Sequence, residues 1–362
     1  MPVITITVEK KFTVEKKFLM EKAEVISLDS LYKSMTRCVK NVIWKPSVSS
    51  FSLNWLERLI LLEKELNTGT YKGREPKPVL VTYPKRRECL CIPFRDRVYQ
   101  RSLNDNVLYP RITKSFIYNN CACQKGKGTD FARNNIKSFL RKFYINNGNS
   151  NLGYVVHIDI KSYYKSMKHD LAKDVFAKYV PSDISEMANT VLDSQYSGDT
   201  GFNPGSQMVQ IAGIAVLSTL DHFCKENLHL KYYLRYMDDF IIIHKDYETL
   251  VVALKSIEHE LSKLGFRVHP NKTKIFPLKQ GFLFLGFTFK ITQTGKVLML
   301  INGKNVKHEK QKLKKMVRKA KLGLIKREKV LECYTAWKAH ASAGTTYKTL
   351  QKMDKFYSDL WR

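Results

Sequence analysis

The stretch from Lys231 to Ile243 reads KYYLRYMDDFIII and places two adjacent carboxylates, Asp238 and Asp239, between two runs of strand-forming residues. Aromatic and β-branched residues on both sides predict a β-hairpin with the two acids at its turn. Like charges at such short range repel each other, and a bound cation would remove that cost. The stretch therefore predicts a divalent metal site at the turn of a hairpin.

A third acid, Asp159, ends a second apolar run, Tyr154 to Ile158. On its own, an aspartate at a strand end is more often a turn or cap residue. Carboxylates from two strand ends, however, are the ligands that two Mg²⁺ ions need for an in-line phosphoryl transfer, and the main-chain carbonyl of Ile160 is a further candidate ligand. Together the acids favour a nucleotide polymerase that uses two Mg²⁺ ions, which Mn²⁺ can replace.

The composition indicates a basic globular protein with a polyanionic partner. The 362 residues include 62 Lys and Arg against 33 Asp and Glu, which gives a formal net charge of +29, and 44% of the residues are apolar. Nucleic acid is favoured over a membrane, because we find neither an apolar run of about 18 residues nor a signal peptide. Seven cysteines, an odd number, predict reduced thiols and a cytoplasmic location.

Two cysteine pairs, Cys89 with Cys91 and Cys121 with Cys123, leave a zinc site open. Such a site would require the two segments to be neighbours in the fold. The alternative is four small side chains on strand faces, since alternate strand residues share a face.

Hydrophobic periodicity and turn residues predict an α+β core followed by a helical module. An identical six-residue repeat, TVEKKF at 7–12 and 13–18, is too short for a solenoid unit and indicates a peripheral start. We expect strands over 88–93, 118–123, 154–160, 232–243 (as a hairpin), 266–276 and 282–289. We expect helices over 51–68, 95–108, 131–144, from about 168, and over 207–229, 247–264, 303–329 and 330–361.

Seven motifs that follow one another in a single order make the chain resemble a reverse transcriptase of the bacterial lineage that includes group II introns, retrons and diversity-generating retroelements. The resemblance covers about residues 75–290. Its motifs are Lys85–Glu88 with Pro93–Val98, Asn120–Thr129, His157–His169, Gly201–Gln207, Tyr236–Asp239, His269–Thr273 and Phe284–Phe287.

This resemblance implies a right-hand polymerase with an antiparallel palm sheet and a helical thumb. Residues 1–50 would be an N-terminal extension, 51–150 the fingers with part of the palm, 151–290 the palm, and 291–362 a basic thumb. The thumb would grip the backbone of the product duplex through the lysines and arginines of residues 303–329, for which a solvated basic face is the alternative.

The resemblance also implies residue roles. Asp159 and Asp238 would be metal ligands, with Asp239 assisting. Tyr164 would be the steric gate that rejects a 2′-hydroxyl, unless it and Tyr163 are simply core aromatics. The dNTP would be bound by Lys85, Arg87, Tyr164, Pro204, Gly205 and Gln207, and template and primer by Lys125, Lys127, Gln210, Tyr236, Met237, Lys272, Gly286, Lys314 and Lys315.

The implied activity is RNA-directed DNA synthesis on an RNA template, from a DNA or RNA primer, with a structured RNA or an accessory protein supplying specificity. Many relatives have Gln where Pro204 stands, and this departure favours a diversity-generating or phage-defence enzyme of bacterial or phage origin. The alternatives are a catalytically silent RNA-binding protein and a template-independent DNA polymerase. The natural template, the primer, fidelity and a homo-oligomeric state are left open.

Overall fold

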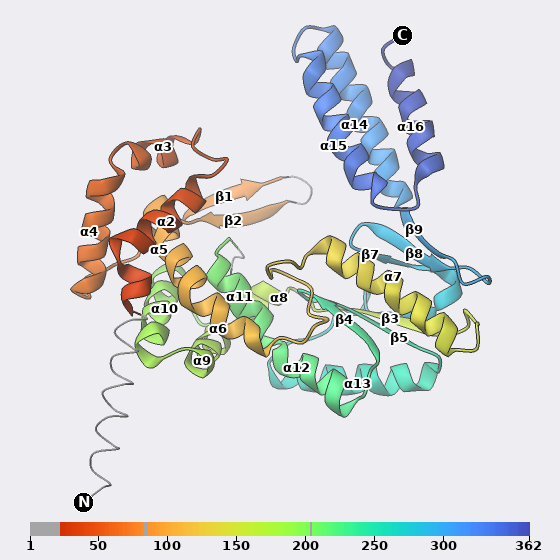
Figure 1. Cartoon of the computed structure of the whole chain (residues 1–362), viewed down its shortest axis with the longest axis horizontal. Helices are drawn as coiled ribbons and strands as arrows, with labels where there is room; N and C mark the ends of the chain where they lie inside the picture. The colour runs from red at the N-terminus through yellow and green to blue at the C-terminus, as the bar shows by residue number, and fades with distance from the viewer. Residues whose placement is uncertain (1–21, 83–85, 203–204) are drawn as a thin grey trace, which may run out of the picture. The chain divides into compact units, whose positions relative to one another are not determined.

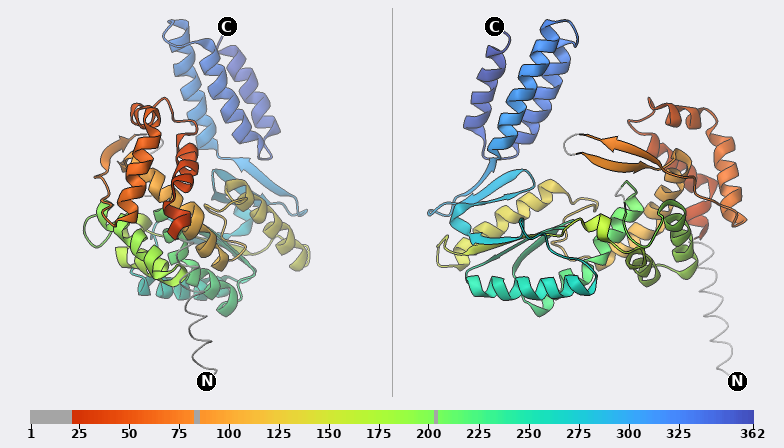
Figure 2. Two further views of the ribbon diagram at one scale, coloured as in Figure 1. Left: turned by 60° about the vertical axis from the view of Figure 1, so that its left-hand side comes forward. Right: turned by 180° about the vertical axis from the view of Figure 1, so that it is seen from behind.

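The computed structural model describes residues 22–82, 86–202 and 205–362, which form two compact units (Figures 1 and 2). Unit 1 comprises the described residues up to Lys125 together with 160–229 and 257–269, and unit 2 comprises 126–159, 230–256 and 270–362. The TVEKKF repeat, Lys85 and Pro204 lie outside the described residues.

Unit 1 is mainly helical and is built around α5, a helix whose residues Val98, Tyr99 and Leu103 are almost completely buried. Helices α2, α3 and α11 pack on α5, and a π-helical turn, Asn104–Leu108, extends it. The unit also contains a hairpin of β1 (Lys77–Val81) and β2 (Arg87–Cys91). Its helices are α2 (Leu28–Val39), α3 (Pro46–Leu53), α4 (Trp55–Asn67), α5 (Phe94–Leu103), α6 (Tyr109–Ile112), α8 (Tyr163–Ser166), α9 (His169–Tyr179), α10 (Ser182–Gln195), α11 (Gln207–Val216) and α12 (Ser218–His222).

Three elements of unit 1 differ from the sequence prediction. The helix expected over 51–68 is interrupted at Asn54, whose ψ of 37° separates α3 from α4. The helix expected over 207–229 is interrupted at Leu217, between α11 and α12. The segment 118–123 forms turns instead of a strand, because Cys123 has a φ of 51° and the buried Asn120 side chain donates to Asp221. Asparagine favours such turns over a regular ladder.

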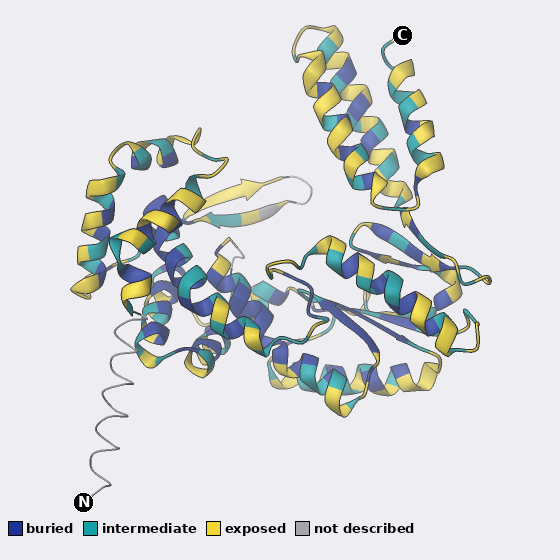
Figure 3. Cartoon of the chain, in the orientation of Figure 1, coloured by how far each residue is buried: buried dark blue, intermediate teal, exposed yellow. Residues whose placement is uncertain are grey.

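Unit 2 is centred on an antiparallel sheet with the strand order β4–β5–β3–β6. Its strands are β3 (Tyr154–Asp159), β4 (Tyr232–Tyr236), β5 (Asp239–His244) and β6 (Lys274–Pro277). The central strands β3 and β5 are dominated by buried apolar residues because helices cover both faces of the sheet (Figure 3). These helices are α7 (Thr129–Asn146) and the first part of α13 (Tyr247–Lys263).

The C-terminal part of unit 2 consists of a three-stranded sheet and three helices. The sheet contains β7 (Phe282–Phe284), β8 (Phe287–Ile291) and β9 (Val297–Ile301), and the helices are α14 (Gly303–Lys321), α15 (Arg327–Ser342) and α16 (Tyr347–Asp359). The basic helix expected over 303–329 is shorter than predicted, because Gly323 takes a φ of 72° and ends it.

Helices and antiparallel sheets together confirm the predicted α+β class. Within the described ranges, no helix is both long and apolar enough to cross a membrane.

The sheet of unit 2 predicts where stability is most sensitive to substitution. Ile242, fully buried in β5, loses its packing in Ile242→Ala, and we expect a loss of about 2–5 kcal/mol in the free energy of unfolding. The matched variant Val252→Ala, at a position 61% exposed on α13, should change it by less than about 0.5 kcal/mol. Urea unfolding followed by circular dichroism measures both, and equal losses would contradict the assignment of β5 to the core.

Candidate active site

A two-residue turn, Met237-Asp238, connects β4 to β5. Tyr236 and Asp239 are register partners at the ends of the two strands, so Asp238 lies at the tip of the hairpin. Met237 has a φ of 58°, a left-handed conformation that costs a non-glycine residue about 1–2 kcal/mol. The surrounding structure therefore has to hold this turn in place.

Arg235 supplies part of that support from inside the protein. It is fully buried, and its Nη1 donates a hydrogen bond of 3.0 Å to the carbonyl oxygen of Met237. A buried guanidinium is stable only when its donors are paired, so this contact ties the Arg235 side chain to the turn. The sequence analysis did not predict a role for Arg235, although an arginine inside an apolar strand was a visible signal.

The register of β3 and β5 places the third acid next to the hairpin. Asp159, the last residue of β3, is directly opposite Asp239, the first residue of β5. Directly opposite residues of an antiparallel pair have Cα atoms about 4.5–5.5 Å apart and side chains on the same face. The predicted convergence of Asp159 with the 238–239 turn is therefore present.

Two cations or potential cations neutralise part of this charge. Lys272 donates from Nζ to both carboxylate oxygens of Asp159, at 2.7 Å each, and Asp159 is 6% exposed. His157 Nε2 lies 3.3 Å from Asp239 Oδ1. The sequence analysis missed His157, although strand alternation places it on the same face as Asp159.

Asp238 retains an uncompensated negative environment. Its pKa is raised to about 6, first by burial and then by the carboxylates of Asp239 and Asp159, against the opposing effects of a backbone hydrogen bond and Lys272. The ionised form of Asp238 is therefore disfavoured by burial and by two neighbouring acids, and a divalent cation would stabilise it.

The carboxylates of Asp159, Asp238 and Asp239 are suitable ligands for a divalent cation. In the present arrangement, the Lys272 ammonium is the group that such a cation would have to displace. As they stand, no three His, Cys, Asp or Glu side chains within 22–82, 86–202 and 205–362 form a group that could hold a metal ion. Both oxygens of Asp159 are occupied by the Lys272 ammonium. A metal bound to Asp159 would therefore take the place that Lys272 now fills. The next residue, Ile160, forms a bridge with Val268.

The cysteine pairs belong to no metal-holding group among the described residues, so the structure does not support a zinc site there. Cys89 and Cys91 lie on β2, Cys121 is buried, and Cys123 Sγ lies 3.9 Å from Gln210 Oε1.

The two tyrosines after Asp159 lie in the short helix α8 of unit 1, not in a strand. Tyr163 is buried against Phe266, with ring centroids 4.9 Å apart, and its hydroxyl donates to the Gly213 carbonyl. Tyr164 is only half-buried, and its ring lies against Gly213 of α11, where an added Cβ would come within 2.9 Å of it. Gly213 thus provides the space that positions Tyr164.

A buried series of hydrogen bonds holds Ser206, in the Gly201–Gln207 motif, just before α11. Ser206 Oγ donates to Gln100 Oε1 (2.7 Å), and Gln100 Nε2 donates to Gln195 Oε1 (2.8 Å). Gly205 and Gln207 are exposed on either side of Ser206. Through these two hydrogen bonds, the start of α11 is connected to Gln100 of α5 and, through Gln100, to Gln195 of α10.

The remaining predicted residues are distributed over turns, the ends of strands and helix α14. Gly286 takes a φ of 85° in the turn between β7 and β8, and this conformation by itself accounts for glycine there. Lys125, Lys314 and Lys315 are exposed, Lys127 is half-buried, and Tyr236 and Met237 are half-buried; Arg87 is the first residue of β2.

Comparison with known proteins identifies the family. A model of the reverse transcriptase (RNA-dependent DNA polymerase) family matches residues 76–289. The chain belongs to the reverse transcriptase family. RNA-dependent DNA polymerase is the activity that the family's description names, and divalent metal ions are the general cofactors of reverse transcriptases. No curated protein matches the sequence.

Solved structures with similarity to this chain include three structures of telomerases from two Candida species. Apo telomerase from Candida tropicalis is 16% identical over 63% of this chain and 49% of its own, with a TM-score of 0.44. A form truncated from the C-terminal domain is 16% identical over 62% and 55%, with a TM-score of 0.47. Telomerase from Candida albicans, in complex with the TWJ fragment of telomeric RNA, is 12% identical over 68% and 51%, with a TM-score of 0.47. The chain spans about half the length of these telomerase chains.

The raised pKa of Asp238 predicts how stability depends on pH without metal. Because folding raises this pKa from 3.8 to about 6, the folded state binds the proton more tightly. The resulting stabilisation is complete below about pH 4 and is lost as the pH rises through about 6. In EDTA at pH 7.5, Asp238→Asn should therefore unfold with a free energy about 1–3 kcal/mol above that of the wild type, and the gain should disappear near pH 4.

Urea unfolding at the two pH values measures this difference. The exposed Asp246, just beyond the other end of β5, provides the matched control Asp246→Asn, which should show no such gain. A wild type that is more stable than Asp238→Asn at pH 7.5 would contradict the electrostatic account.

Proposed function

We propose that this reverse transcriptase extends a DNA or RNA primer on an RNA template with dNTPs, using two Mg²⁺ ions held by Asp159, Asp238 and Asp239. The observation that supports this most directly is the pairing of Asp159 with Asp239 beside the Asp238 turn. When bound, the metal ions would activate the primer hydroxyl and stabilise the leaving pyrophosphate. Mn²⁺ would substitute for Mg²⁺.

Lys272 would act as an exchangeable cation in this proposal. Its ammonium neutralises Asp159 before metal binds, and the side chain, 59% exposed, has space to move away. Released, it would lie near the primer end, where a cation can attract phosphate oxygens. Lys85, Arg87 and Gly205 are the proposed dNTP-binding residues besides Tyr164 and Gln207.

The exposed lysines of α14 support the proposed thumb function. Lys314 and Lys315 are part of a helix with no acidic residue in its first turn and three basic residues in its last. Such a surface binds the phosphate backbone without reading sequence. Lys125 and Lys127 are proposed to bind the template backbone in the same way.

A catalytically silent RNA-binding role is less well supported. Burial of Asp238 beside Asp239 and Asp159 raises its pKa and so costs folding energy when it is ionised, and a protein that only binds RNA gains nothing from this arrangement. We infer further that the enzyme belongs to the bacterial lineage of group II introns and acts in a diversity-generating or antiphage system. Sequencing of nucleic acid co-purified with the chain would identify its template and its accessory RNA.

Primer extension tests the activity. On poly(rA)/oligo(dT) with Mg²⁺ and dTTP, we expect incorporation by the wild type and a loss of about 10²–10³-fold or more in Asp238→Asn, because one ligand contributes several kcal/mol to transition-state charge stabilisation. The control Asp246→Asn should retain activity. Wild-type incorporation no greater than that of Asp238→Asn would favour the silent RNA-binding protein, and equal incorporation without template would favour template-independent synthesis.

Nucleotide selection tests the role of Tyr164. Tyr164→Val removes the ring that would meet a 2′-hydroxyl, so the preference for dNTP over rNTP should fall by about 10- to 100-fold. Gly213→Ala should also change this preference, since its Cβ would displace the Tyr164 ring. Tyr163→Phe keeps the buried ring and should leave the preference unchanged. Steady-state kinetics with dTTP and UTP measure it, and an unchanged ratio in Tyr164→Val would remove Tyr164 from this role.

A further inference from the structure

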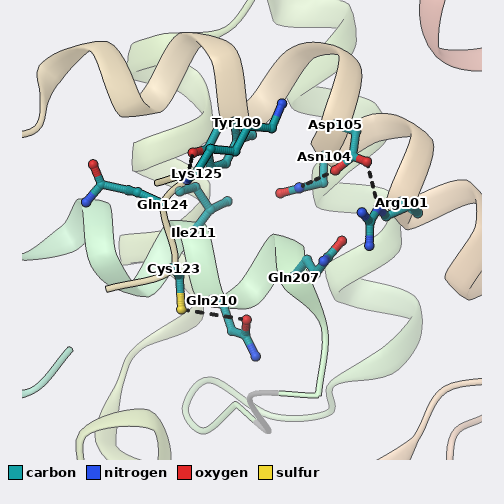
Figure 4. A pocket seen from close by; sticks show the side chains of 10 residues that line it. All are labelled: Arg101, Asn104, Asp105, Tyr109, Cys123, Gln124, Lys125, Gln207, Gln210 and Ile211. Carbon is teal, nitrogen blue, oxygen red and sulfur yellow. Dashed lines mark hydrogen bonds and ion pairs between the residues drawn. The ribbon is translucent and has the colours of Figure 1, made fainter. Parts of the chain in front are cut away.

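A polar cavity of about 310 Å³ lies in unit 1, between the π-helical turn that follows α5, the segment 123–125 and the start of α11 (Figure 4). Its volume is at the lower end of the range for small-ligand pockets, about 300–1,000 Å³. Two glutamines with proposed roles, Gln207 and Gln210, line it, but so do Arg101, Asn104 and Asp105, to which the sequence analysis gave no role.

Asn104 is the informative residue of this lining. It is 5% exposed, and its Nδ2 donates to Asp105 Oδ1 at 3.1 Å. A carboxylate only accepts hydrogen bonds, so this contact fixes which end of the amide is which. The other end, Oδ1, is buried and accepts no hydrogen bond from any residue that the structure describes, and Figure 4 shows it on the cavity side. An unpaired buried carbonyl is costly, typically about 1–3 kcal/mol.

Asp105 is held ionised by two arginines. Its Oδ2 accepts from Arg101 Nε at 2.6 Å and from Arg37 Nη1 at 2.7 Å. Burial on its own would raise the pKa of Asp105, but the hydrogen bonds from Arg101, Asn104 and Arg37 and the charge of Arg101 lower it below its usual range. The carboxylate therefore stays an acceptor, and the orientation of the Asn104 amide is independent of pH near neutrality.

Apart from the cation Lys125, the polar groups in the rest of the lining are uncharged and have adjustable geometry. The carboxamides of Gln207 and Gln210 come from successive turns of one face of α11. Each carboxamide has one acceptor and two donor hydrogens. The π-helical turn, a local insertion that is frequent at functional sites, displaces Asn104 from a regular helical position.

These features favour one ligand chemistry. A phosphate is bound best by several free cationic donors, yet Arg101 of the lining and its neighbour Arg37 are both committed to Asp105. The other cation of the lining is Lys125, whose ammonium lies 5.2 Å from the centroid of the Tyr109 ring. A metal cation is disfavoured because the single carboxylate of this cavity is already neutralised. The amide side chains of the lining pair best with a planar group that has its own hydrogen-bond donors and acceptors. The edges of nucleobases carry such donors and acceptors.

We propose that this cavity holds one unpaired nucleobase of a single-stranded polynucleotide, with Asn104 Oδ1 accepting a hydrogen bond from an exocyclic amino group of the base. The inference rests on the proposed function, in which that strand is the template. Cytosine carries an N4 amino group where uracil carries an O4 acceptor, so the cavity prefers cytosine to uracil. Asn104 is a specificity-determining residue that takes no part in the chemistry.

Anisotropy of fluorescein-labelled rC12 and rU12 tests this preference in EDTA without dNTPs. The two oligomers have the same charge, so the large electrostatic contribution cancels in the ratio of their affinities. Their difference in single-strand stacking is the same for every variant, so the change in the ratio on substitution reports the contact with the protein. The full-length chain should bind rC12 about fivefold more tightly, the value of one neutral hydrogen bond of about 1 kcal/mol. In Asn104→Leu, which keeps the side-chain size, the ratio should fall to about one.

Asn189→Leu is the matched control. Asn189 also has a buried Oδ1 that accepts no bond from the described residues of the chain, but it lies on α10 outside this cavity, so its variant should keep the fivefold ratio. If Asn104→Leu unfolds, an oligomer of N4,N4-dimethylcytidine tests the wild type instead, and it should bind as weakly as rU12. Equal binding of rC12 and rU12 by the wild type, or a ratio that survives in Asn104→Leu, would overturn the proposal.

Primer extension by the same preparation separates this result from the proposed function. A wild type that extends primers but binds rC12 and rU12 equally refutes the nucleobase site alone. A wild type that prefers rC12 but does not extend primers refutes the polymerase function and leaves the site in place.

Discussion

The antiparallel pairing of Asp159 with Asp239 is the constraint on which the site in unit 2 depends. It sets two carboxylates opposite each other at one end of the sheet, with Asp238 at the adjoining turn. A slip of one residue between β3 and β5 would move Asp159 to the other face of the sheet. The apolar residues of both strands, buried between α7 and α13, prevent such a slip because it would expose them.

The protein offsets the cost of these acids with residues from several elements. Lys272 neutralises Asp159, His157 contacts Asp239, and the buried Arg235 holds the strained turn at Met237. Asp238 has a raised pKa, because it is buried and lies beside Asp239 and Asp159. In the proposed function a cation would take the place of the Lys272 ammonium, whose exposed side chain can leave without disturbing the core.

In unit 1, one helix serves two purposes. Gln210 and Gly213 of α11 are three residues apart and therefore neighbours on the helix surface. Gln210 lines the polar cavity, while Gly213 receives the ring of Tyr164. The hydrogen bonds from Ser206 to Gln100 and from Gln100 to Gln195 fix the start of this helix. The positions of Gln210 at the cavity and of Gly213 at the Tyr164 ring therefore depend on the same buried hydrogen bonds.

The sequence by itself determined the α+β class, the hairpin at the 238–239 acids and the family, because strand alternation and motif order are local properties of the chain. The predicted bounds of α7, β3 and α13 agree with the observed ones to within two residues. The sequence did not predict the break at Asn54 or the turns of 118–123, where single asparagines outweigh the hydrophobic pattern. Only the tertiary structure decided that Lys272 binds Asp159 and that Asn104 presents a carbonyl to a cavity. Both depend on residues brought together by folding, whose distances and hydrogen-bond directions no periodicity in the chain encodes.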